Sequence, residues 1–465
     1  MPSYIAPVED MMFLFNKLRN NEKYNEIEKY KEVNSELVKD ILEEAAKISQ
    51  NLILPLAKSG DESPPVLENG VVRTSPGYKE AYSKFIEDGW ISLSCDPKYG
   101  GQGMPKTVST FFDEMLSSTS LAFKLYSELT IGAYNCILRH ASEEIKDTYL
   151  PKMVEGKWSG TMCLTEPVCG TDLGLLKTKA EEQSDGTYKI SGQKIFITSG
   201  DHDLTENIIH LVLARATDSP KGTKGISLFL VPKFIVKEDG NVGSRNGVST
   251  GSIENKMGIK SVPVAETVYD SVKLSNDRLL GGKPGLGFKH SMMTLDLARP
   301  GVAAQAVGTA AGALELAVTY AGRRKQFGQP ISGFQMIQGM LADMAQQTEA
   351  ARWLTYACAA TADAGNGNVT KIAAMAKCFA TDTAVKVATD AVQVFGGYGF
   401  MEDYPIAKYY RDAKILQIYE GTNQVQRIVI ARNLIKESSQ HDYYNEVIPE
   451  EKQEAYGGPE VTANV

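Results

Sequence analysis

A glutamate in a glycine-containing turn is the strongest candidate in this sequence for action on a bound molecule. Glu420 lies in the segment QIYEGTNQVQR, residues 417–427. Gly421 allows the backbone to bend where a side chain would block the approach of another molecule, and Thr422 can cap a following helix. A carboxylate just before a capped helix start can be aimed at a ligand. An ordinary turn with an exposed glutamate is the alternative that this segment alone leaves open.

Two further segments carry groups that suit a planar ring or a phosphate. Residues 163–173, CLTEPVCGTDL, offer threonine hydroxyls and the N–H groups of a glycine turn as hydrogen-bond donors. Residues 194–200, KIFITSG, place Phe196 where its ring can lie against a planar group and Thr198 where its hydroxyl can reach a ring nitrogen. Each has a plainer interpretation, because such turns often satisfy their own backbone and a strand phenylalanine often belongs to the core.

Two segments near predicted helix ends complete the set. Residues 323–335, RRKQFGQPISGFQ, hold adjacent arginines that can clamp a pyrophosphate or simply solvate a helix end. Residues 393–400, QVFGGYGF, follow a helical stretch with a glycine-rich turn, which suits a helix C-cap. The sequence has no GxxxxGK[ST] P-loop, no GxGxxG after a strand and no GxSxG elbow. Any dinucleotide is therefore expected to bind without a Rossmann fold.

The composition is that of a globular protein with several packed units. The chain has 465 residues, 43% of them hydrophobic and 23% charged, and a net charge of -8 without a lysine- and arginine-rich block. This balance argues against nucleic-acid binding. The six cysteines show no CxxC spacing, which favours a reducing, cytoplasmic compartment, and the five histidines show no metal-ligand spacing. We expect no metal site, no export signal and no membrane span.

The hydrophobic periodicity changes twice along the chain. It predicts an N-terminal helical domain at 36–160, a middle domain of short antiparallel strands at 161–275 and a C-terminal helical bundle at 276–436. A helical arm at 1–35 precedes them, and an acidic, partly disordered tail is expected at 437–465. The predicted fold class is α+β, in the order helices, sheet, helices.

Taken together and in this order, the five segments resemble the acyl-CoA dehydrogenase family over residues 36–436. The fold that this resemblance implies is a helical domain, an antiparallel β domain and a four-helix bundle. The implied activity is the FAD-dependent dehydrogenation of an acyl-CoA thioester to the trans-2-enoyl-CoA, a step of fatty acid β-oxidation. The resemblance also implies an electron-transfer flavoprotein as the electron acceptor and a homodimer or homotetramer as the assembly.

The resemblance assigns roles residue by residue. Glu420 matches the base that removes the α-proton while the β-hydride goes to flavin N5, and its N–H matches part of an oxyanion hole. The substrate contacts that it implies are Thr171, Asp296, Arg299 and Gly421. The cofactor contacts that it implies, some of which are expected to reach a neighbouring subunit, are Leu164, Thr165, Gly170, Thr171, Phe196, Thr198, Arg324, Gln326, Phe327, Gln335, Gln393, Gly396, Gly397, Thr422 and Gln424.

One branch of the family places its base on the predicted helix that carries Arg299, at the preceding residue. That residue is Ala298 here, which cannot take a proton, so the base assignment rests on Glu420. Burial against the acyl chain should raise the pKa of Glu420, whereas the helix start at Thr422 should lower it. The sequence does not set the balance between these two effects.

The sequence also departs from the family pattern. Val168 and Cys169 stand where small residues are usual, and Phe196 replaces a frequent tryptophan. Residues 1 to about 260 resemble the larger subgroup that includes 3-methylmercaptopropionyl-CoA dehydrogenases, and the remainder resembles the short-chain and medium-chain enzymes. An acyl-CoA oxidase that uses oxygen and a non-catalytic flavin-binding relative are the competing interpretations.

Overall fold

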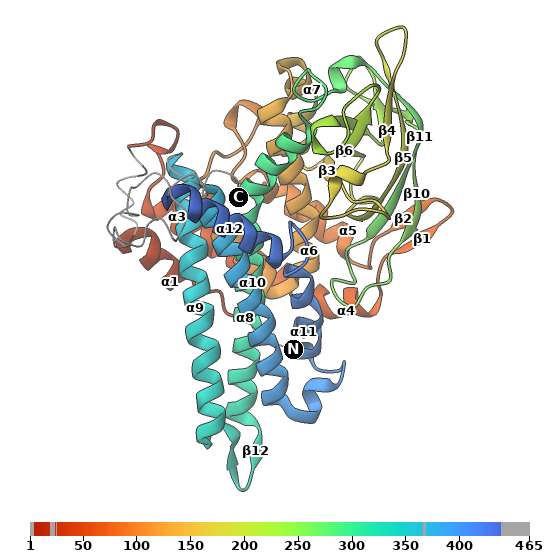
Figure 1. Cartoon of the computed structure of the whole chain (residues 1–465). Coiled ribbons are helices and arrows are strands. Elements are labelled where there is room, and N and C mark those ends of the chain that lie inside the picture. Colours follow the sequence, from red (N-terminus) through yellow and green to blue (C-terminus); the bar gives the residue numbers. More distant parts are fainter. Residues whose placement is uncertain (1–3, 19–23, 25, 366–368, 439–465) are drawn as a thin grey trace, which may run out of the picture.

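The computed structural model of the chain describes residues 4–18, 24, 26–365 and 369–438. Figure 1 shows helices from the N-terminal part, a sheet from the middle of the chain and long C-terminal helices. The predicted order of helices, sheet and helices is therefore confirmed. The boundaries proposed between the domains stay a prediction, and the predicted tail from residue 439 onward lies outside the described residues.

The N-terminal part is built around the long helix α6, Lys106–His140, which is kinked at Ser120, where φ is -155° and ψ is 97°. Short-range capping fixes where several helices begin. The Asn34 side chain, for example, accepts a hydrogen bond from Leu37 N (3.0 Å) at the start of α3. The other elements of this part are α1 (Val8–Phe13), η1 (Leu14–Leu18), η2 (Glu28–Tyr30), α3 (Ser35–Ile48), η3 (Ser49–Ile53), α4 (Leu56–Glu62), β1 (Val66–Glu68), β2 (Val71–Arg73), α5 (Tyr78–Glu87), η4 (Trp90–Ser92), η5 (Pro97–Tyr99) and α7 (Glu143–Val154).

The middle part is a seven-stranded sheet in the order β10-β11-β5-β4-β6-β3, with β7 also paired to β6. Four pairs are antiparallel, as predicted, but β6 runs parallel to both β3 and β4. The sheet is therefore mixed. The parallel pairing of β3 with β6 is possible because a long connection separates these two strands in the sequence. Its strands are β3 (Trp158–Cys163), β4 (Lys179–Glu182), β5 (Tyr188–Thr198), β6 (Asn207–Ala216), β7 (Ile226–Pro232), β10 (Val248–Ile253) and β11 (Val264–Leu274), and a separate hairpin pairs β8 (Phe234–Val236) with β9 (Val242–Arg245).

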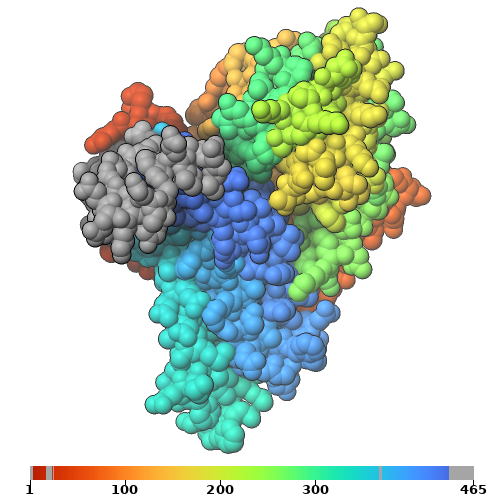
Figure 2. Space-filling model, viewed as in Figure 1, coloured from red at the N-terminus to blue at the C-terminus, as the bar shows by residue number. Residues whose placement is uncertain are grey.

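The C-terminal part is a bundle of long helices. Its elements are α8 (Gly287–Arg323), the hairpin of β12 (Lys325–Gln326) and β13 (Gln329–Pro330), α9 (Gln335–Ala364), α10 (Val369–Phe395), α11 (Pro405–Leu416) and α12 (Asn423–Ser438). The hairpin end projects from the molecule, at the bottom of Figures 1 and 2. Among the described helices, α8 alone is long and apolar enough to cross a membrane, but 72% of its apolar window is buried inside the protein, as in a core helix.

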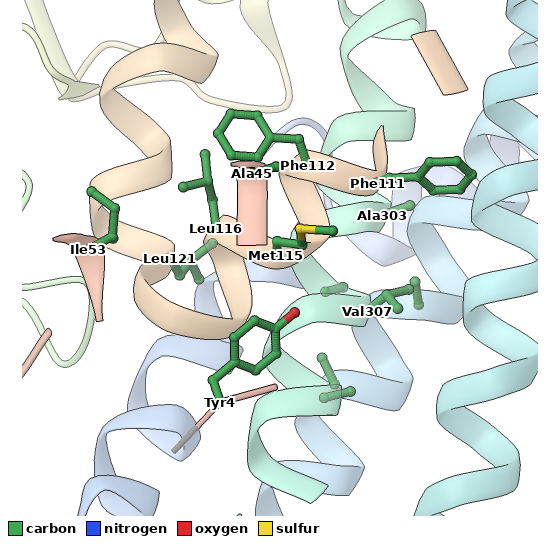
Figure 3. Packing of buried hydrophobic residues seen from close by; sticks show 14 of the residues in the cluster. Tyr4, Ala45, Ile53, Phe111, Phe112, Met115, Leu116, Leu121, Ala303 and Val307 are labelled. Carbon is green, nitrogen blue, oxygen red and sulfur yellow. The ribbon is translucent and has the colours of Figure 1, made fainter. Parts of the chain in front are cut away.

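One large cluster of buried side chains joins the N-terminal and C-terminal parts. Figure 3 shows Met115 of α6 close to Ala303 and Val307 of α8 within this cluster. Met11 and Phe15 are fully buried in the same cluster. The described part of the predicted N-terminal arm therefore packs into the core, in the same cluster in which α6 packs against α8.

Candidate active site

The turn that carries Glu420 connects α11 to α12 and has an unusual backbone. Glu420 has a φ of 57° and Gly421 has a φ of 83°, a left-handed region that is uncommon for a residue with a side chain. Thr422 caps α12 as predicted, because its Oγ1 accepts a hydrogen bond from Val425 N (3.3 Å). The Gln426 side-chain amide donates to the carbonyls of Glu420 (3.2 Å) and Gly421 (3.0 Å). The N–H of Glu420 has no acceptor among the described residues, so it is available to a ligand.

The Glu420 carboxyl is enclosed and electrostatically perturbed. Its Oε2 is buried and has no hydrogen-bond partner in the described part of the chain. The pKa of Glu420 is raised to about 7, mainly by burial and further by the Glu128 carboxylate, while Arg299 and Lys377 oppose the rise. Burial and the Glu128 charge thus outweigh the opposing charges of Arg299 and Lys377. A carboxyl that titrates near neutrality is suited to accept a proton at physiological pH.

Helix α8 contributes a charged residue, Arg299, that acts on this carboxyl. The Arg299 guanidinium pairs with Asp296, and the second carboxylate oxygen of Asp296 accepts from Thr370 Oγ1 (2.7 Å). Arg299 is buried, and its Nε has no hydrogen-bond partner among the residues that the structure describes. Arg299 lies close enough to Glu420 for its positive charge to lower the pKa of that carboxyl, so the fold places these two residues near each other. Ala298, the residue before Arg299, has no group that could accept a proton, as the sequence indicated.

A buried ion pair joins the CLTEPVCGTDL segment to β5. Lys194 Nζ lies 2.8 Å from Glu166 Oε1 and also donates to Leu164 O (3.1 Å). The Glu166 carboxylate accepts two more hydrogen bonds, from the backbone N–H groups of residues 177 and 178. Ile195 N donates to Thr165 O (3.0 Å). Two of the predicted cofactor segments therefore lie side by side, and no local pattern in the sequence marks the ion pair that joins them.

The residues expected to face a flavin ring are accessible. Phe196 is 59% exposed with a φ of 58°, so its ring does not belong to the core. Thr198 is half-buried, and its carbonyl accepts a hydrogen bond from Thr161 Oγ1 (2.9 Å), so its hydroxyl is not used in that contact. Gly170 and Thr171 are exposed. These groups leave an open face beside the sheet for a planar molecule.

The predicted cofactor residues of the segments 323–335 and 393–400 lie away from the sheet. Figure 1 shows the β12–β13 hairpin at the opposite end of the molecule from β5. Within one chain, the predicted cofactor residues of the hairpin therefore lie far from Phe196 and Thr198 of β5. The Arg324 guanidinium lies over the Tyr398 ring, 5.3 Å from its centroid, and Phe327 at the hairpin tip is 93% exposed. Gln335, Gln393 and Gln424 are exposed as well, and one hollow is lined by Arg324, Gln326, Gly396 and Gly397 together with Tyr320, Phe395 and Tyr398.

Three family models match the chain, one for each part of the fold. They are described as the acyl-CoA dehydrogenase N-terminal domain, at residues 35–157, the middle domain, at 161–272, and the C-terminal domain, at 285–435. The 3-methylmercaptopropionyl-CoA dehydrogenase of Ruegeria pomeroyi is 38% identical over 445 residues, which cover 91% of this chain and 75% of that protein. The chain belongs to the acyl-CoA dehydrogenase family.

Solved structures agree with this assignment. Butyryl-CoA dehydrogenase from Megasphaera elsdenii is 37% identical with a TM-score of 0.75, and the match covers 86% of this chain and 98% of that one. A structure described as the electron transferring flavoprotein of Acidaminococcus fermentans is 38% identical with a TM-score of 0.75, covering 86% of this chain and 97% of that one. Relatives named as a 3-methylmercaptopropionyl-CoA dehydrogenase and as a short-chain acyl-CoA dehydrogenase therefore both match this chain. The division of the resemblance between its N-terminal and C-terminal parts stays a prediction.

Acyl-CoA dehydrogenases are FAD-dependent flavoproteins, and the residues of this chain fit that cofactor. The exposed ring of Phe196 and the hydroxyl of Thr198 suit a flavin ring. A Cβ added at Gly396 or Gly397 would meet no atom of the described residues within 4 Å, so the backbone there is open to close approach. Arg324 in the same hollow suits a diphosphate. Which of these residues contact FAD stays a prediction.

Glu128 of α6 is a neighbour of the base that the sequence analysis did not single out. Its side chain is buried and paired with Lys124, and it presses against α8, where a Cβ on Gly301 would lie 2.6 Å from Glu128 Oε1. Nothing in the local sequence distinguishes Glu128 from a solvated helix glutamate. Its relation to Glu420 arises only because α6 packs on α8.

We predict that Glu128→Gln shifts the pH dependence of flavin reduction to lower pH. The change removes a negative charge that raises the pKa of Glu420, while Arg299 and Lys377 still face the carboxyl from α8 and α10. More of the base is then ionised at a given acidic pH, so the acid limb of the rate profile moves down. The measurement is the rate of flavin reduction by acyl-CoA across pH. Glu143→Gln on α7 is the exposed control, and an unmoved limb in Glu128→Gln would contradict the coupling.

Proposed function

We propose that this acyl-CoA dehydrogenase uses Glu420 as the base that removes the α-proton of an acyl-CoA thioester. The supporting observation is a half-buried glutamate whose Oε2 is buried and unpartnered among the described residues and whose pKa is raised to about 7, in a turn with a left-handed backbone. Arg299 and Asp296 line the same site from α8, and Gly421 keeps the turn free of a further side chain. The product is the trans-2-enoyl-CoA.

The α-proton of a thioester is weakly acidic, so its removal requires stabilisation of charge on the carbonyl oxygen. The N–H of Glu420, which has no acceptor among the described residues, is positioned by its turn to donate to that oxygen. FAD, when bound, supplies the acceptor for the hydride that leaves Cβ. The contribution of the chain is to orient the thioester, hold the base and exclude water around it.

We further propose an electron-transfer flavoprotein as the acceptor of the electrons, because a structure described as the electron transferring flavoprotein of Acidaminococcus fermentans contains a chain that is 38% identical to this one. A homodimer or homotetramer would let the hairpin group of one chain complete the cofactor site of another, since these two groups lie apart within one chain. The six cysteines are all free and buried, which supports a reducing, cytoplasmic location.

A panel of acyl-CoA thioesters tests the proposed reaction. Anaerobic mixing with a dehydrogenation substrate should bleach the visible absorbance of the bound flavin, and electron-transfer flavoprotein should restore it much faster than oxygen. The panel should include straight, branched and thioether acyl groups. Rapid reoxidation by oxygen would instead assign the protein as an acyl-CoA oxidase. Absence of bleaching across the panel would favour a non-catalytic flavin-binding protein.

A further inference from the structure

A buried lysine lies directly behind the turn that carries the proposed base. Lys377 belongs to α10 and has no exposed surface. Its Nζ donates to Gly421 O (3.0 Å) and to Asn423 Oδ1 (2.9 Å), and it makes no ion pair with any described carboxylate. An ammonium buried without an ion-pair partner is costly, so an apolar side chain would serve packing better.

The partners of Lys377 are the groups that fix the turn. Gly421 O belongs to the second of two consecutive left-handed residues, and Asn423 is the first residue of α12. Asn423 is itself buried and donates to Thr381 Oγ1 (2.8 Å) and Asp382 Oδ1 (2.7 Å) of α10. A left-handed backbone at a residue with a side chain is strained and persists only where its surroundings over-determine it. Lys377, Asn423 and Gln426 provide those surroundings.

We propose that Lys377 is the positioning residue of the catalytic turn, holding the Gly421 carbonyl and the start of α12 so that the carboxylate and N–H of Glu420 face the acyl-CoA. This inference rests on the proposed role of Glu420 as the base. It adds that α10, which carries none of the predicted catalytic or substrate groups, controls the geometry of the reaction from behind the turn.

The charge of Lys377 gives the proposal a second, independent consequence. Burial lowers the pKa of Lys377 to about 8, and the groups that face it include Cys378 and Asp382 of α10, Glu420 of the turn and Arg299 of α8. Conversely, Lys377 and Arg299 are the two cations that lower the pKa of Glu420, against Glu128 from α6. Removal of the ammonium should therefore raise the pKa of Glu420 further and move the acid limb of the rate profile to higher pH.

The test compares Lys377→Met and Lys377→Gln as FAD-loaded proteins. Methionine removes both charge and hydrogen bonds, and glutamine keeps a donor without the charge. Displacement of a reacting group by about 1 Å costs on the order of 100-fold, so Lys377→Met is expected to lose about that factor in kcat with KM changed much less. Lys377→Gln should lose less rate, and both variants should show the acid limb at higher pH. Amide hydrogen exchange of a peptide spanning residues 417–427 should be faster in Lys377→Met.

Lys386→Met provides the matched control, because Lys386 lies on the same helix but is exposed and paired with Asp390 (2.7 Å). It should behave like the parent protein. Wild-type kcat and an unmoved acid limb in both Lys377 variants would overturn the proposal. If both Lys377 variants fail to fold or lose FAD, Lys377 contributes to stability alone and the proposal is overturned. The same conclusion holds if the FAD-loaded variants survive but their acid limb does not move. Glu420→Gln measured in parallel separates the two hypotheses, because a normal flavin-reduction rate in that variant would refute the base itself.

Discussion

Glu420→Gln is expected to retain FAD and yet lose about 10²–10⁴-fold in the rate of flavin reduction by acyl-CoA. Glutamine fills nearly the same space, so the turn, the Thr422 cap and the Gln426 hydrogen bonds should persist. The amide cannot accept the α-proton. Because the variant also lacks a titrating group at this position, the residual rate should lose the rise with pH that a base with a pKa of about 7 produces.

The measurement is rapid mixing of the FAD-loaded variant with acyl-CoA under anaerobic conditions, across pH. Arg432→Glu on α12 is a useful companion, because Arg432 is exposed and a carboxylate there should not restore activity to Glu420→Gln. Flavin reduction by Glu420→Gln at the parent rate would refute the base assignment. A variant that had lost FAD would be compared after reconstitution, so that cofactor loss is not mistaken for loss of the base.

Lys194→Met should destabilise the sheet edge that carries the CLTEPVCGTDL segment, by about 3–5 kcal/mol in the free energy of unfolding. Lys194 has no exposed surface and Glu166 is nearly as deeply buried, so removal of the ammonium leaves an uncompensated carboxylate inside the protein. The two backbone N–H groups at 177 and 178 remain as partners of Glu166 and limit the loss. FAD should also bind more weakly, because Thr165 and Phe196 lie on the two segments that the pair joins.

Thermal and denaturant unfolding, with and without added FAD, measure this effect. The double variant Lys194→Met with Glu166→Gln should recover much of the lost stability, because it removes the unpaired charge as well. Lys189→Met is the control on the same strand, where the side chain is exposed. If the single variant unfolds like the parent protein, the pair does not hold the segment in place.

The structure changes the interpretation of several sequence features. Phe196 reads as a core residue of an alternating strand when it is considered alone, but its positive φ and its exposure place its ring outside the core. The strand-rich region reads as antiparallel, because turn signals report only neighbouring strands. The parallel pairing of β6 with β3 and β4 depends on contacts across a long connection, which no local pattern encodes.

The sequence by itself determined the order of helices and sheet, because hydrophobic periodicity is a local property, whereas the candidate base Glu420 and the loss of its alternative at Ala298 came from the resemblance to the family. The tertiary structure decided how that base behaves. Its raised pKa depends on burial and on charges carried by α6, α8 and α10, which are remote in sequence and meet only on packing. For the same reason Glu128, Lys194 and Lys377 look like ordinary charged residues in the sequence and become recognisable only when the fold buries them beside the turn or the cofactor segments.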